Sequence, residues 1–312
     1  MISDRPSSFL DPAALMAIRH LELRARTVVE GFWHGLHRSP YHGFSVEFTE
    51  YRPYSPGDDP RYLDWRLLAR TDRYFIKKFE DETNLRCLLL ADNSRSMTFG
   101  SQGYTKAEYA NTLAATLAYF LNQQGDAVGL LTFDETVREY LPPRNRPGHL
   151  RQLMLALEKP AGGKATDLVG PLRHVAELLR KRGLVVLISD LLAPIETLEN
   201  SLALLTASGH EVLVFQVLDP AEIDFAFETA SRFEDLENGR DLFLEPALAR
   251  AGYQRRFKAH TTEVRAICER LGCTVQRVVT NQSLEFALFD FLKARTARGK
   301  LTVRRANRSG SH

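Results

Sequence analysis

The chain lacks any long run of apolar residues. Its longest apolar runs, such as 87–91 and 184–188, have the length of β-strands, whereas a membrane-spanning helix needs about 18 or more residues. Residues 1–10 also lack the basic start and the apolar centre of a secretory signal. These absences predict a cytoplasmic protein with no membrane span.

Cysteine is scarce, with only Cys87, Cys268 and Cys273 in 312 residues. None of the three belongs to a Cys-x-x-Cys pair, and an odd count does not indicate a disulfide framework. Because Cys87 lies inside an apolar run, we interpret it as a small core residue. A structural use is favoured over a catalytic one for all three.

Several enzyme signatures are also missing. Residues 162–166 include a lysine, but position 158 is glutamate where a nucleotide-binding P-loop needs glycine. No Gly-x-Ser-x-Gly nucleophile motif occurs, and no helical histidine pair has a plausible third zinc ligand. The sequence therefore predicts a protein that is not itself an enzyme, and any ATP hydrolysis is expected to belong to a partner.

Charge is present in both signs, with 41 basic and 39 acidic residues, but its distribution is uneven. Between Phe291 and His312 there are seven Lys or Arg residues and no acid, so the rest of the chain is net negative. Such a tail is typical of a solvated chain end. Because no aromatic residues are interleaved with its basic residues, we expect no nucleic-acid partner.

Buried strands alternate with helices in the larger part of the chain. Strands are predicted at 85–91, 127–133, 137–141, 184–189, 212–218 and 274–279, and helices at 106–123, 150–157, 168–182, 196–208, 249–271 and 283–294. This alternation predicts an α/β fold with a doubly wound, mostly parallel six-stranded sheet. The turn at 237–240 predicts an inserted hairpin within about 221–246, with strands at 225–230 and 241–244.

The residues before 85 do not follow this alternation. A helix is predicted at 11–31, and strands at 44–54 and 74–80 flank the turn cluster 55–60 and a short helix at 62–69. We therefore predict three parts: an N-terminal helix with an accessory β-containing module at 1–84, the main domain at 85–293, and a basic flexible tail at 294–312.

Polar side chains follow two predicted strands at the points where the strands end. Asp92, Ser94 and Ser96 follow the first strand, Asp190 follows the fourth, and Thr166 precedes the helix that leads to the fourth. In doubly wound folds, ligands bind beyond the carboxyl ends of the strands. A set of oxygen donors suits Mg²⁺ or Mn²⁺. The alternative is that these residues only cap helices.

The same residues resemble the metal-ion-dependent adhesion site of von Willebrand factor A domains. The resemblance implies that Asp92, Ser94, Ser96, Thr166 and Asp190 ligate a divalent metal, directly or through water. It also implies that a carboxylate from a partner protein completes the metal's coordination shell. One departure is that residue 191 is leucine, where many members of that family have glycine.

A second resemblance involves residues 51–66, 69–70 and 79–82, which are similar to the signature of domain of unknown function fifty-eight. This resemblance extends from about 43 to 295, and proteins of this kind look like companions of MoxR-type AAA ATPases. It implies an adaptor or co-chaperone in protein assembly or remodelling, with that ATPase and a client protein as partners. For the signature itself, docking of the accessory module is favoured, and a partner-binding surface is the alternative.

A different class of function is a metal-dependent hydrolase acting on phosphate esters. Such an enzyme needs a general base or a second metal near the first. Asp134 and Asp167 are the nearby candidates, and both also have ordinary turn or capping explanations. The sequence therefore favours the interaction module.

Overall fold

The computed structural model describes residues 10–38, 51–53, 75–77, 85–162, 169–179, 182–225, 227, 231–234, 241–244 and 246–295. The chain forms two compact units: residues 1–37 with 85–312, and residues 38–84. In the smaller unit, β1 (Tyr51–Pro53) pairs with β2 (Phe75–Lys77) in an antiparallel ladder. The other residues of the signature that was recognised in the sequence lie outside the described part.

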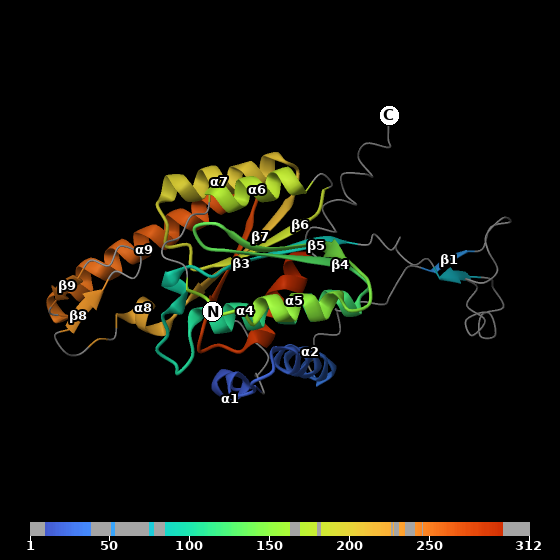
Figure 1. Cartoon of the computed structure of the whole chain (residues 1–312), viewed down its shortest axis with the longest axis horizontal. Helices are drawn as coiled ribbons and strands as arrows, with labels where there is room; N and C mark the ends of the chain where they lie inside the picture. Colours follow the sequence, from blue (N-terminus) through green and yellow to red (C-terminus); the bar gives the residue numbers. More distant parts are fainter. Residues whose placement is uncertain are drawn as a thin grey trace. The chain divides into compact units, whose positions relative to one another are not determined.

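A six-stranded sheet is the centre of the larger unit (Figure 1). Its strands are β3 (Arg86–Asp92), β4 (Ala127–Phe133), β5 (Val137–Arg144), β6 (Leu184–Ser189), β7 (Glu211–Leu218) and β10 (Thr274–Val279). They lie in the order β10-β7-β6-β3-β4-β5. All neighbours are parallel except β4 and β5. The predicted doubly wound, mostly parallel sheet is therefore confirmed.

The four central strands, β3, β4, β6 and β7, are apolar along most of their length because both faces of the sheet are covered there. In β3, Cys87, Leu89 and Ala91 belong to one hydrophobic core, whereas Leu88 and Leu90 belong to a second. This alternation follows from the two-residue repeat of a strand. The edge strand β5 differs, because it is half exposed and contains Pro142 and Pro143, which are tolerated at a sheet edge.

Helices form a layer on each face of the sheet (Figure 1). The first layer contains α1 (Pro12–Met16), α2 (Leu21–Arg38), α4 (Lys106–Gln123), α5 (His149–Leu157) and the helical residues 284–295. The second contains α6 (Val169–Leu178), α7 (Ile195–Ala207) and α9 (Pro246–Arg270). Each predicted helix of the main domain is thus present: α4 has the predicted bounds, and the others have shifted ends.

The predicted helix at 11–31 is in fact two helices, α1 and α2. Between them, the carbonyl of Ile18 accepts a hydrogen bond from Arg24 Nε (2.6 Å), and the amide of Leu21 donates to Glu158 Oε1 (3.4 Å). These side-chain partners stabilise the break. The second helix also continues past Gly35 to Arg38.

Both helices belong to the larger unit rather than to an N-terminal module of residues 1–84. The apolar residues Leu21, Ala25, Val28 and Phe32 repeat at helical spacing along α2 and lie in the core of the first layer. Within that core, Trp33 stacks on Phe120 of α4, with ring centroids 5.9 Å apart. The smaller unit is therefore confined to residues 38–84.

The inserted hairpin is confirmed, because β8 (Ser231–Glu234) and β9 (Asp241–Leu244) pair in an antiparallel ladder. The prediction that a strand begins at Phe225 is wrong. A short helix, α8 (Pro220–Asp224), precedes the hairpin, and Phe225 ends it in the left-handed region at φ 50°. Asp219 and Pro220 supply a capping residue and a helix-starting proline, which are the local signals for this helix.

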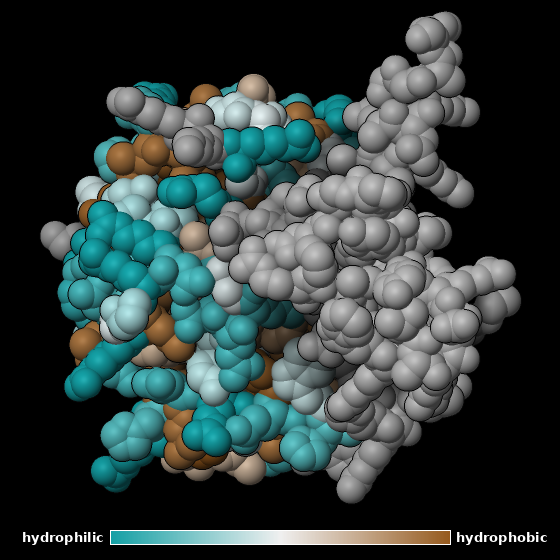
Figure 2. All heavy atoms as spheres, turned by 90° about the vertical axis from the view of Figure 1, so that its right-hand side faces the viewer, coloured by the Kyte–Doolittle hydropathy of each residue, from teal (hydrophilic) through white to brown (hydrophobic). Residues whose placement is uncertain are grey.

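Hydrophilic side chains cover much of the described surface in Figure 2, with hydrophobic residues scattered between them. Within the described residues, no helix combines the length and the hydrophobicity that a bilayer crossing requires.

Candidate functional site

The strand order changes direction between β3 and β6. From β3 the chain continues to β4 on one side, and from β6 it continues to β7 on the other. The connections that leave the carboxyl ends of these two neighbouring strands therefore run in opposite directions. We call this place the switch point of the sheet, and doubly wound folds bind ligands at such a point. Asp92 is the last residue of β3, Ser189 is the last residue of β6, and Asp190 follows Ser189. The predicted residues from these two loops are thus brought together.

Asp92 is fully buried and held by two hydrogen bonds. Its Oδ1 accepts from the amide of Ser94 (2.9 Å), and its Oδ2 accepts from the hydroxyl of Ser189 (2.6 Å). Burial, followed by repulsion from Asp190, raises the pKa of Asp92 to about 6, and the hydrogen bonds only partly offset this. The site therefore contains a fixed carboxylate whose charge would be stabilised by a cation.

The two serine hydroxyls of the loop lie together. Ser94 is buried and precedes the short 3₁₀ helix η2 (Arg95–Thr98), and its Oγ is 3.1 Å from the Oγ of Ser96. The side chain of Met97, which is fully buried, anchors η2 in the core. The alternate positions 92, 94 and 96 thus supply one carboxylate and two hydroxyls within a single tight turn.

Asp190 is buried and has partners at both carboxylate oxygens. Its Oδ1 accepts from the amide of Leu192 (3.2 Å), and its Oδ2 accepts from Lys106 Nζ (2.8 Å). Leu191, which lies between Asp190 and Leu192 in the sequence, has φ 57°. This is a left-handed conformation that glycine adopts most easily. Leu191 therefore adopts a backbone conformation that glycine favours, and its buried side chain belongs to the second core.

Lys106, the first residue of α4, was not predicted as part of the site. Its side chain is fully buried, and its Nζ also lies 2.5 Å from Glu222 Oε1 of α8. Although burial alone would lower it, the pKa of Lys106 is raised by Asp190 and Glu222, so this lysine stays charged. One signal was available in the sequence, because a basic residue in the first turn of a helix is opposed by the helix dipole.

The third predicted loop is described only in part. The amide of Gly162 donates to the carbonyl of Asn93 (3.2 Å), which places the start of this loop against the Asp92 loop. Thr166 and Asp167 lie outside the described residues, so their roles stay predictions. Asn93 Oδ1 is buried and has no hydrogen-bond partner in the described part of the chain.

Asp219 ties neighbouring loops together at the same edge of the sheet. It is fully buried, and its oxygens accept from Ser101 Oγ (2.5 Å), the Ser101 amide (2.9 Å) and Thr280 Oγ1 (3.2 Å). It also caps the start of α8, which carries Glu222. The segments that follow β3, β7 and β10 are thereby linked, and Glu222 is held beside Lys106.

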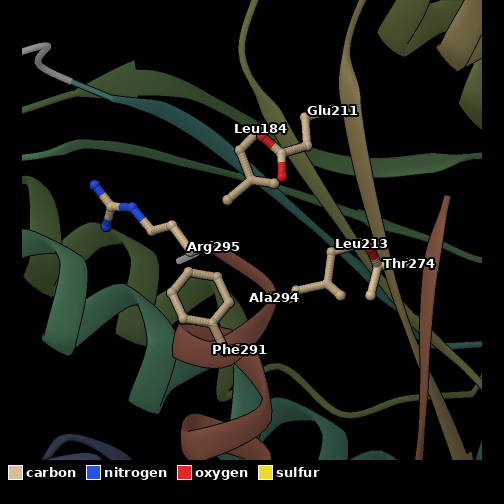
Figure 3. Close-up of a pocket in the computed structure, with 7 residues that line it drawn as sticks. All are labelled: Leu184, Glu211, Leu213, Thr274, Phe291, Ala294 and Arg295. Carbon is tan, nitrogen blue, oxygen red and sulfur yellow. The ribbon is translucent and has the colours of Figure 1, made fainter. Parts of the chain in front are cut away.

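The described residues include no group of three His, Cys, Asp or Glu side chains that could hold a metal. The Asp92 site instead combines two carboxylates with hydroxyls, as the predicted ligand set does. The small pocket in Figure 3 is a different feature, because it lies at the amino ends of β6, β7 and β10. It is lined mostly by apolar groups, together with Glu211 and Arg295 (Figure 3), so we do not assign it a function.

The strand order, the two helical layers and the acidic loops at the switch point define a von Willebrand factor A-like α/β fold. The chain belongs to the family described as "Protein of unknown function DUF58", whose model matches residues 50–263. This confirms the resemblance seen in the signature. The fold and family suggest a protein-interaction module.

Relatives with similar sequences are found in Mycobacterium species. Over 291 residues the chain is 30% identical to uncharacterized proteins of Mycobacterium bovis and Mycobacterium tuberculosis, covering 91% of this chain and 90% of each relative.

Solved structures share less of the sequence. BatB from Bacteroides thetaiotaomicron is 14% identical, with a TM-score of 0.47, covering 68% of this chain and 99% of that one. The VWA domain of SpRpn10 is 15% identical, with a TM-score of 0.39, covering 65% and 94%. Because these scores are low, the fold assignment rests on the strand order of this chain.

Proposed function

We propose that this protein is a metal-dependent interaction module, in which Asp92, Ser94, Ser96, Thr166 and Asp190 hold Mg²⁺ or Mn²⁺. The single observation that supports this most is the convergence of Asp92, Ser94, Ser96 and Asp190 at the switch point of the sheet. Helix capping alone explains this arrangement poorly, because Ser94 makes no side-chain capping bond to η2 and Asp92 is the end of a strand.

The donor chemistry fits a hard divalent cation. Carboxylate and hydroxyl oxygens are the ligands that Mg²⁺ and Mn²⁺ prefer. The raised pKa of Asp92 is caused by burial and by Asp190, and both effects would be relieved by a bound cation. Because the site has few negative charges, a metal there would keep affinity for an additional carboxylate.

We propose that this carboxylate comes from an Asp or Glu of a client protein, and that the module acts with a MoxR-type AAA ATPase. The support is the signature at residues 51–66 together with the lack of a nucleotide-binding loop in this chain. In this role the protein is an adaptor or co-chaperone in protein assembly or remodelling, and not an enzyme.

The hydrolase alternative receives no support from Asp134, one of its two candidate bases. Asp134 Oδ1 accepts from the amide of Thr136 (3.0 Å), and its Oδ2 pairs with Arg138. Although burial opposes it, these partners lower the pKa of Asp134 below its ordinary value. A carboxylate with this environment is a weak general base and is explained by its turn.

The test is binding of the purified protein to a MoxR-type ATPase of the same organism, measured by surface plasmon resonance. We expect binding in Mg²⁺, and loss of binding in EDTA or in Asp92→Ala. Glu199→Ala is the control, because Glu199 lies on α7 in the second helical layer and forms an exposed ion pair with Arg270. Binding that survives both EDTA and Asp92→Ala would contradict the metal-dependent mechanism. No binding in Mg²⁺ would exclude this ATPase as the partner.

A further inference from the structure

Lys106 lies between the proposed metal site and a helix outside it. Its Nζ is 2.8 Å from Asp190 Oδ2 and 2.5 Å from Glu222 Oε1, and the lysine side chain is fully buried. The two acceptors differ in kind. Asp190 is a proposed metal ligand, whereas Glu222 belongs to α8, which lies at the same end of the sheet as the segment after β3 (Figure 1).

Glu222 is held in place by its surroundings. Its Oε2 accepts from the amide of Asp219 (3.0 Å) in the capping box of α8. The end of α8 is fixed to α9, because Gln254 Nε2 donates to the carbonyl of Asp224 (3.1 Å) and the rings of Phe225 and Tyr253 are 4.5 Å apart. The position of Glu222 therefore depends on the contact between α8 and α9.

The charge of Lys106 opposes a divalent cation at Asp190. A buried ammonium next to a metal ligand repels the metal, and this repulsion is strong because little water screens it. Glu222 counteracts this effect because its carboxylate pairs with Lys106 Nζ and so offsets part of the ammonium's positive charge. Without Glu222, Lys106 would have Asp190 as its only acidic partner in the described part of the chain.

We propose that Glu222 sets the metal affinity of the Asp92 site by acting through Lys106, so that the position of α8 controls how tightly the metal binds. This inference rests on the metal site proposed above. Lys106 and Glu222 are positioning residues, since neither is a proposed ligand. Because Glu222 lies on α8 and α8 contacts α9, a partner that displaces these helices weakens the site.

The experiment is calorimetric titration of Mg²⁺ into four proteins: wild type, Glu222→Gln, Lys106→Met, and the variant with both changes. The double variant replaces the ion pair by two neutral side chains of similar size, so it is expected to fold even if Lys106→Met alone does not. Glu199→Gln is the matched control, because it removes one exposed acid from an ion pair on α7.

We expect Glu222→Gln to weaken Mg²⁺ binding about tenfold or more, since Lys106 then interacts with Asp190 alone. The double variant should bind at least as tightly as wild type, and Glu199→Gln should match wild type. If Lys106→Met folds, adding Glu222→Gln to it should change the Kd by less than about threefold.

Three results would overturn the inference. If the double variant binds as weakly as Glu222→Gln, or if no variant differs from wild type, Glu222 does not act through Lys106, although the metal site itself stands. If wild type binds no Mg²⁺ at all, the proposed metal site fails, and this inference fails with it.

Discussion

The carboxylate of Asp92 is fully buried. Two hydrogen bonds, from Ser94 and Ser189, fix the orientation of its carboxylate, but burial and the neighbouring Asp190 still raise its pKa to about 6. In the metal-free protein this charge is a source of instability rather than of stability. A residue with this property is typical of a functional site.

Asp92→Asn is therefore predicted to stabilise the metal-free protein at pH 7. The native pKa of about 6 lies above the ordinary value of 3.8, so the wild type loses stability as pH rises through this interval and the loss is complete above it. We expect a gain on the order of 2 kcal/mol, measured as the difference in Tm between the two proteins in EDTA. The difference should shrink toward zero near pH 4.

Asp134→Asn serves as the opposite case in the same experiment. The pKa of Asp134 is lowered, so its charge stabilises the native state above the ordinary pKa, and this contribution is lost as pH falls. The asparagine variant should therefore be less stable than wild type at pH 7. A Tm for Asp92→Asn below that of wild type at pH 7 would show that Asp92 is an ordinary structural carboxylate.

At the scale of elements, α2 shows how local pattern and tertiary contact combine. Its buried residues Leu21, Ala25, Val28 and Phe32 form one face that packs into the first core. Leu23 on the same helix is 48% exposed. The helix therefore contributes stability through one face only.

Val28→Asp is predicted to destabilise the larger unit by about 3 kcal/mol or more, because it places an unpaired charge in a fully buried position. Leu23→Asp, on the exposed face of the same helix, should change the free energy of unfolding by less than about 0.5 kcal/mol. Urea denaturation measures both. Equal, small effects would mean that α2 is not part of the core.

The elements that could be predicted from the sequence are those with strong local patterns. The apolar runs 85–91, 127–133 and 184–189 predict buried strands, and their ends predict where Asp92 and Asp190 lie. The break at residue 18 could not be predicted, because Arg24 and Glu158 stabilise it through side-chain contacts. The short helix α8 had local signals that the hairpin pattern obscured.

Lys106 is the part of the site that could not be predicted from the sequence. A lysine at the start of a helix is usually a solvated residue, and its burial depends on Glu222, which is 116 positions away. Nothing in the local sequence pairs the two residues. The predicted ligands, in contrast, follow from strand ends, and the structure brings four of the five to the switch point or its adjoining turn.

At the scale of the whole molecule, the doubly wound sheet gives the protein one edge where loops from distant parts of the chain meet. Asp219 ties the segments after β3, β7 and β10 together at this edge, and Lys106 connects α4, β6 and α8. This arrangement suits a module that couples metal and partner binding.

The central claim is that the Asp92 site binds a divalent metal, and the most direct test is calorimetric titration of Mg²⁺ and Mn²⁺ into wild type and Asp92→Ala. The account predicts saturable binding of one ion per chain in wild type, and loss of that binding in the variant with the fold retained by circular dichroism. Equal heats for wild type and variant, or no binding by wild type, would contradict the claim.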